Sequence, residues 1–226
     1  MHLEIMSRKI YNICDMKKGG DVVDSGFMKK IRERVLASAD GSVFTSSDFA
    51  DIADTATIRQ GLNRLVHENI LRRVFRGVFE KPKYSKLLGE FVATSPDAVA
   101  NALARSYHWT IAPCGDTALN LLGLSEQVTA VWSYISDGPY KTYEWDHVKI
   151  EFRHRTNREI TGFSYKTSLV IHGLKALGRE RISSETIDYL SDSLTEPEKK
   201  ALLRESSESS DWIVDTVRTI CSGGKE

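Results

Sequence analysis

Cysteines and long apolar runs are scarce in this sequence of 226 residues, and each scarcity excludes a class of protein. Only Cys14, Cys114 and Cys221 occur, and without a Cys-x-x-Cys pair they do not indicate a zinc site or a disulfide framework. No apolar run approaches the ~20 residues that span a bilayer, and charged residues interrupt the N-terminal stretch where a signal peptide has its apolar core. We therefore expect a folded cytoplasmic protein with reduced thiols and no membrane partner.

A net charge is also missing, because 31 Lys and Arg residues balance 31 Asp and Glu residues. The composition as a whole therefore gives no indication of nucleic acid as a partner. The distribution of charge along the chain does indicate nucleic acid, since residues 55–86 contain eight basic residues against two acidic ones. Residues 183–210, in contrast, contain seven acidic residues against three basic ones. Such asymmetry suggests that the segments have separate tasks.

Residues 27–86 have the pattern of a winged helix-turn-helix domain. Apolar residues recur at helical spacing from Phe27, and a cluster of capping residues at 45–48 precedes a second, short helix. Asp54 can cap a third helix, and residues 70–82 have the β-branched and aromatic pattern of two strands. Three helices followed by a hairpin is the order of elements in a winged helix. Residues 1–26 are an N-terminal extension, either an extra turn or start-site artefact, or a dimerising arm.

Residues 87–226 predict a second, mixed α+β domain with a helical C-terminal part. Pro96 is well placed at the start of a helix that runs to about Tyr107, and a short helix follows at 116–122. Strand-like segments occupy 128–136 and 148–153. Helical patterns then return at 165–177, 184–193, 196–206 and 211–221. The predicted fold class is thus α+β.

The basic third helix and hairpin make DNA the predicted partner. A helix in the major groove needs donors for base edges, and a flanking wing needs positive charge for phosphates. The alternatives are an ordinary solvated surface and a winged helix that binds protein. The residues assigned to base edges are Thr57, Gln60, Asn63 and Arg64; those assigned to phosphates or the minor groove are Arg59, Arg72, Arg73, Arg76 and Lys81.

Enzyme chemistry is not expected. The tract at 115–119 (GDTAL) superficially resembles a turn of toxin-like nucleotidyltransferases, but the acidic pair that holds magnesium in such enzymes is missing, since Asp137 and Asp146 are isolated. The histidines show no ligand spacing. We therefore predict no cofactor and no metal. The basic segment at 152–158 is expected to be exposed near a strand end, either as an ordinary solvated loop or in contact with an acidic partner or DNA phosphates.

From about Phe27 to His172 the chain resembles the AbiEi family of antitoxins. The resemblance is carried by three tracts in order: 57–65 (TIRQGLNRL), 71–79 (LRRVFRGVF) and 115–124 (GDTALNLLGL). It implies a winged helix that represses its own operon by binding operator repeats in double-stranded DNA. It also implies a second domain that opposes a nucleotidyltransferase-like toxin, without indicating which residues do so.

The sequence therefore predicts a repressor and antitoxin, with a homodimer expected if the operator has paired half-sites. Two alternatives stay open. One is a ligand-sensing transcription factor whose α+β domain holds a small molecule. The other is a protein-interaction module that does not touch DNA.

Overall fold

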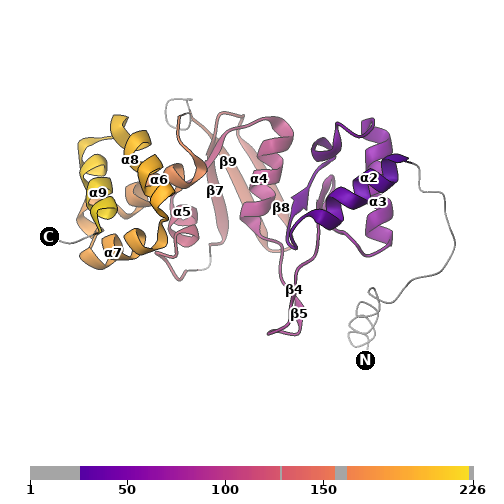
Figure 1. The fold of residues 1–226 in the computed structure, drawn as a ribbon, viewed down its shortest axis with the longest axis horizontal. Helices are drawn as coiled ribbons and strands as arrows, with labels where there is room; N and C mark the ends of the chain where they lie inside the picture. The colour runs from indigo at the N-terminus through magenta and orange to yellow at the C-terminus, as the bar shows by residue number, and fades with distance from the viewer. Residues whose placement is uncertain (1–25, 128, 156–161, 224–226) are drawn as a thin grey trace.

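A computed structural model describes residues 26–127, 129–155 and 162–223. Three parts follow one another along the long axis of the molecule, with a central sheet between two helical ends (Figure 1). The predicted extension at 1–26 lies outside the described residues apart from Gly26. Within the described ranges, no helix combines the length and the apolar character needed to cross a membrane. The mixed α+β class is confirmed.

The first part has its apolar core between two helices and a small sheet. Ile31, Phe49, Leu62 and Leu65 are fully buried there. The sheet is antiparallel in the order β1-β3-β2. Its elements are α2 (Gly26–Ala37), β1 (Val43–Phe44), η2 (Ser46–Phe49), α3 (Thr55–His67), β2 (Arg72–Phe75) and β3 (Val78–Glu80).

The predicted second helix is only a 3-10 turn, η2. Its polar residues bond to one another and so favour a tight turn over a continuing helix. The Asp48 carboxylate accepts a hydrogen bond of 2.7 Å from the Thr45 backbone N–H, and the Thr45 hydroxyl lies 2.7 Å from that of Ser47. The capping cluster in the sequence therefore marks a capped turn.

A second hairpin projects from the body of the molecule between the first and central parts (Figure 1). It pairs β4 (Tyr84–Ser85) with β5 (Glu90–Phe91), and Leu87 at its tip is 94% exposed. The predicted domain boundary after Lys86 falls inside this hairpin.

The central part is a four-stranded sheet in the order β6-β7-β9-β8, in which only β7 and β9 are parallel. The sequence patterns missed two of its strands, β6 and β8, which are short or half-exposed. Its elements are α4 (Pro96–Tyr107), β6 (Ile111–Pro113), α5 (Asp116–Leu121), β7 (Val131–Ser136), β8 (Lys141–Trp145) and β9 (Val148–His154).

The C-terminal part is a helical bundle around Leu174, Leu190, Ile213 and Val217, all fully buried. This confirms the predicted helical C-terminal part. Its helices are α6 (Tyr165–Leu177), η4 (Arg179–Arg181), α7 (Ser184–Ser193), α8 (Glu196–Glu205), η5 (Ser206–Glu208) and α9 (Asp211–Ser222).

The first and central parts share apolar contacts, which fix the β2–β3 hairpin against strand β8. The Phe75 ring centroid lies 5.8 Å from that of Tyr143 and 5.5 Å from that of Trp145. Arg105 of α4 donates a hydrogen bond of 3.0 Å to the Val43 carbonyl. The tip of the hairpin is therefore held beside the edge strand of the central sheet.

Candidate nucleic-acid interface

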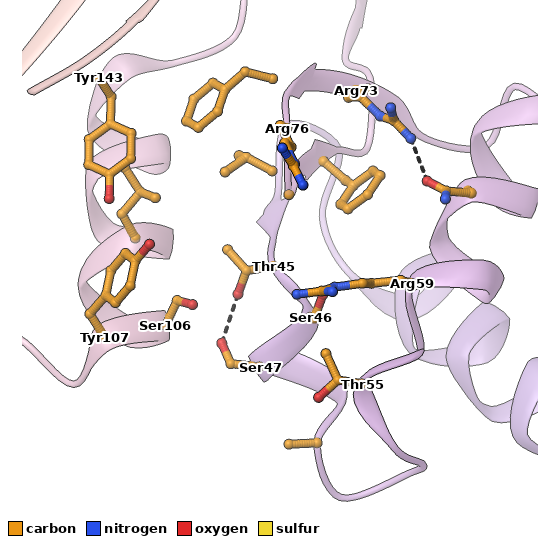
Figure 2. Close-up of a pocket in the computed structure, with 17 residues that line it drawn as sticks. Thr45, Ser46, Ser47, Thr55, Arg59, Arg73, Arg76, Ser106, Tyr107 and Tyr143 are labelled. Atoms are coloured by element: carbon orange, nitrogen blue, oxygen red, sulfur yellow. Dashed lines mark hydrogen bonds between the residues drawn. The ribbon is translucent and has the colours of Figure 1, made fainter. Parts of the chain in front are cut away.

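An open cleft of about 750 Å³ lies where α3 and the β2–β3 hairpin meet α4 and β8. One wall comes from the first part of the chain and the other from the central part, and their side chains point into the space between them (Figure 2). The polar and aromatic lining residues are Thr45, Ser46, Ser47, Thr55, Arg59, Asn63, Arg73, Phe75, Arg76, Phe79, Ser106, Tyr107 and Tyr143.

The cleft is strongly basic. Three arginines line it, and its lining includes no Asp or Glu. Arg59 and Arg76 are exposed, and neither has an ion-pair partner among the residues that the structure describes. Arg73 is held in place, because it donates a hydrogen bond to Asn63 Oδ1 and lies 5.6 Å from the centre of the Phe79 ring. Guanidinium groups without carboxylate partners make this surface suited to a phosphate-bearing ligand.

The local sequence explains why α3 presents this face. Ile58, Leu62 and Leu65 are buried on one side of the helix. Arg59 and Asn63, four residues apart, share the adjacent side, about 100° round the helix from Ile58 and Leu62. Both line the cleft, together with Arg73 and Arg76 from the hairpin. The Gln60 side chain is exposed on the same helix but does not line the cleft.

Two of the residues predicted to read bases have partners inside the first part. The Thr57 hydroxyl donates a hydrogen bond of 2.6 Å to Asp54, which caps α3. Arg64 Nε lies 3.2 Å from a carboxylate oxygen of Glu68. Hydrogen bonds from Arg32, and to a lesser extent from Arg64, lower the pKa of Glu68. Thr57 and Arg64 therefore have structural contacts and do not line the cleft.

Arg72 is directed away from the cleft, toward a buried carboxylate. Its guanidinium is paired with Glu80, which is 2% exposed, and also donates to the Val92 carbonyl and to the Thr94 hydroxyl at 3.1 Å. Thr94 in turn donates a hydrogen bond of 2.7 Å to Glu80. Arg72 thus ties the hairpin to the segment that leads into the central part.

Lys81 is also engaged within the chain. Its ammonium group donates hydrogen bonds of 3.1 Å and 2.7 Å to the carbonyls of Leu36 and Ser38, and lies 3.2 Å from Asp40. It therefore satisfies carbonyls at the C-terminal end of α2. Lys81 and Arg72 both have structural contacts, and we do not include them in the interface.

The opposite wall was not predicted from the sequence. Tyr107 is 50% exposed, and its ring stacks on Trp109 with a centroid separation of 4.7 Å. The Tyr143 hydroxyl is buried and has no hydrogen-bond partner in the described part of the chain. Burial, and secondarily the neighbouring Tyr107 hydroxyl, raise the pKa of Tyr143. No local pattern places these residues opposite α3, because their positions depend on the packing of α4 and β8 against the first part of the chain.

The tract at 115–124 forms the short helix α5 and contributes mainly to packing. Thr117 is buried, and its hydroxyl accepts a hydrogen bond of 2.7 Å from the Ser133 backbone N–H. Burial raises the pKa of the neighbouring Cys114 thiol. Across the described ranges, His, Cys, Asp and Glu side chains form no group of three that could hold a metal ion.

The basic segment predicted at 152–158 is described as far as residue 155. Phe152 is buried in the central core, whereas Arg153 is exposed and lies 3.2 Å from Glu151. The remaining residues of the segment, 156–158, lie outside the described residues.

Residues 30–202 match the model of a family of unknown function, DUF6088. The chain belongs to this family. The DUF6088 match includes both walls of the cleft, from α3 and the hairpin to α4 and β8.

No curated protein matches the chain. Among solved structures the chain is similar to the RV2827C protein from Mycobacterium tuberculosis, with 12% sequence identity and a TM-score of 0.35. That comparison covers 87% of this chain and 76% of the other. Similarity at this level does not indicate a shared function.

Proposed function

We propose that this protein binds double-stranded DNA, with α3 and the β2–β3 hairpin acting as a winged helix-turn-helix. The observation that carries the proposal is that Arg59 and Arg76 have no ion-pair partner within the described residues and line a cleft whose lining includes no Asp or Glu. Such a face attracts the phosphates of a duplex and releases their counterions.

The contacts divide between phosphates and bases. Arg59, Arg73 and Arg76 are assigned to phosphates, because they surround one cleft and come from two elements. Gln60 and Asn63 are assigned to base edges, where side-chain amides recognise adenine. The Asn63 carbonyl oxygen already accepts a hydrogen bond from Arg73, which leaves its NH2 group to donate to a base.

We further propose that the protein represses its own operon and acts as an antitoxin against a nucleotidyltransferase-like toxin. The support is the ordered resemblance to the AbiEi family in α3, the hairpin and the tract at 115–124. On this proposal the central and C-terminal parts oppose the toxin, and a homodimer binds operator repeats. Co-expression of the chain with a nucleotidyltransferase-like toxin encoded beside it tests this half, and the chain should restore growth.

Gel-shift titration against salt tests the DNA-binding half, with the duplex upstream of the gene and an unrelated duplex of equal length. We expect Arg59→Ala and Arg76→Ala each to weaken binding to both duplexes and to lower the salt slope by about one phosphate contact. Arg179→Ala, at an exposed arginine of η4, is the matched control and should bind like the wild type. Unchanged binding by both cleft variants would refute the interface.

A further inference from the structure

The cleft has a second wall, and binding of DNA phosphates does not require it. That wall belongs to the central part of the chain and presents aromatic and hydroxyl groups, Ser106, Tyr107 and Tyr143, across from Arg59 and Arg76 (Figure 2). A site with cations on one side and aromatic rings on the other suits a ligand with two chemically different ends.

The basic side suits a phosphate group. Arg59 comes from α3 and Arg76 from the hairpin tip, so their guanidinium groups approach the cleft from two elements. Planar guanidinium groups bind phosphate oxygens with two parallel hydrogen bonds. Because no Asp or Glu lines the cleft, a phosphate bound there does not contact a carboxylate.

The aromatic side suits a planar ring. Tyr107 stacks on Trp109, and Trp109 packs edge-on against Phe152 at a centroid separation of 5.5 Å. Gly138 reinforces this packing, because a Cβ atom at that position would lie 2.4 Å from the Trp109 ring. Tyr107 is thus supported from behind while half of its surface stays exposed, as in platforms on which nucleic-acid bases stack.

The Tyr143 hydroxyl supplies an independent indication of a ligand. It is buried, and its residue lines the cleft. It makes no direct hydrogen bond to a described residue, although the Tyr107 hydroxyl lies close enough to raise its pKa. A buried hydroxyl without a partner is costly unless another molecule completes its bonding. A ligand that shifts the side chains covering this hydroxyl can accept a hydrogen bond from it.

We propose that this cleft binds a nucleoside phosphate, with its phosphate at Arg59 and Arg76 and its base against Tyr107. The volume of about 750 Å³ lies within the usual range of roughly 300–1,000 Å³ for small-molecule sites. Because the same arginines are assigned to DNA phosphates, nucleotide and DNA compete for the cleft. Only this competition rests on the proposed DNA-binding function; nucleotide binding itself does not.

Isothermal titration calorimetry on the full chain without DNA tests the proposal. The probes are the four ribonucleoside triphosphates, ribose 5-phosphate and inorganic triphosphate. We expect at least one nucleotide to bind at least about tenfold more tightly than either probe that lacks a base, because stacking on an aromatic side chain is worth roughly a 5- to 150-fold change in affinity. Equal binding of nucleotides and base-free probes, or no nucleotide binding, overturns the proposal.

Variants separate the two ends of the ligand. Arg76→Ala should weaken nucleotide and triphosphate alike, whereas Tyr107→Ala should weaken only the nucleotide and Tyr107→Phe should retain most of the affinity. Tyr140→Ala is the matched control, because Tyr140 is 69% exposed and lies outside the cleft. Circular dichroism checks that each variant is folded. Nucleotide affinity that is the same in wild type, Arg76→Ala and Tyr107→Ala places the site elsewhere and overturns the proposal.

Gel shifts with the bound nucleotide added then test competition, which we expect to appear as release of DNA. DNA binding without any nucleotide binding refutes this inference and leaves the proposed function intact. Nucleotide binding without DNA binding refutes the proposed function and leaves the nucleotide site intact.

Discussion

Arg72 and Arg76 lie four residues apart in one hairpin, yet their replacement should affect different properties: Arg72→Ala should lower the stability of the fold, whereas Arg76→Ala should weaken DNA binding. Arg72 pairs with Glu80, whose side chain is 2% exposed. Arg72→Ala therefore leaves a buried carboxylate whose remaining side-chain donor, among the described residues, is the Thr94 hydroxyl. Breaking a buried ion pair in this way costs about 3–5 kcal/mol. Because the Arg72 side chain is itself 39% exposed, water replaces part of the interaction, and we expect a loss of roughly 2–4 kcal/mol.

Arg76 has no such partner. Its side chain is exposed, so Arg76→Ala should change the free energy of unfolding by less than about 0.5 kcal/mol while it weakens DNA binding. Urea titration followed by tryptophan fluorescence measures both variants, since the chain has four tryptophans. Arg72→Ala should unfold at clearly lower urea than wild type and Arg76→Ala at the same urea.

A double variant checks the cause of the Arg72 effect. Replacing both charges, as in Arg72→Met with Glu80→Leu, removes the pair without leaving a buried charge, so it should be more stable than Arg72→Ala alone. If Arg72→Ala unfolds at the wild-type urea concentration, or if the double variant is no better than the single one, then the burial of Glu80 does not govern the stability of this hairpin.

Two further predictions concern the scaffold. The Arg34 guanidinium, 2.6 Å from both carboxylate oxygens of Asp51, lowers the pKa of Asp51 to about 2 from its ordinary 3.8. The stabilisation of the folded state by this ion pair is therefore present above about pH 4 and is lost as the pH falls through 2. The difference in urea midpoint between wild type and Asp51→Asn should be constant from pH 7 to 5 and should shrink toward pH 2. A difference that stays constant down to pH 2 contradicts this prediction. Gly173→Ala should lower the free energy of unfolding by about 1–3 kcal/mol in the same urea assay. The new Cβ atom would lie 2.3 Å from Leu122 Cδ1 and would overpack the contact of α6 with the end of α5. If the variant is as stable as wild type, Leu122 moves without an energetic cost and the prediction is wrong.

The sequence predicted the elements whose signals are local. The apolar spacing of Ile58, Leu62 and Leu65 indicated α3, and Asp54 caps it as expected. The Arg76-Gly77 turn was also predictable, because glycine between two strand-like segments is typical of a turn. In the structure Gly77 adopts a φ of 88°, which favours glycine. The helical C-terminal part followed in the same way from periodicity and capping residues. Strands β6 and β8 were missed, because three- and five-residue strands give little pattern of their own.

The sequence alone determined that residues 55–86 are basic and that Arg59 and Asn63 share one face of a helix. Only the tertiary structure decided which cations of that stretch remain available. Arg72 and Lys81 resemble Arg73 and Arg76 in the sequence, but folding places them against a buried carboxylate and helix-terminal carbonyls. The sequence also did not predict that tyrosines lie opposite the arginines, because their position depends on how two parts of the chain pack together. Periodicity and capping report local backbone structure, whereas the partner of a side chain is set by long-range contacts.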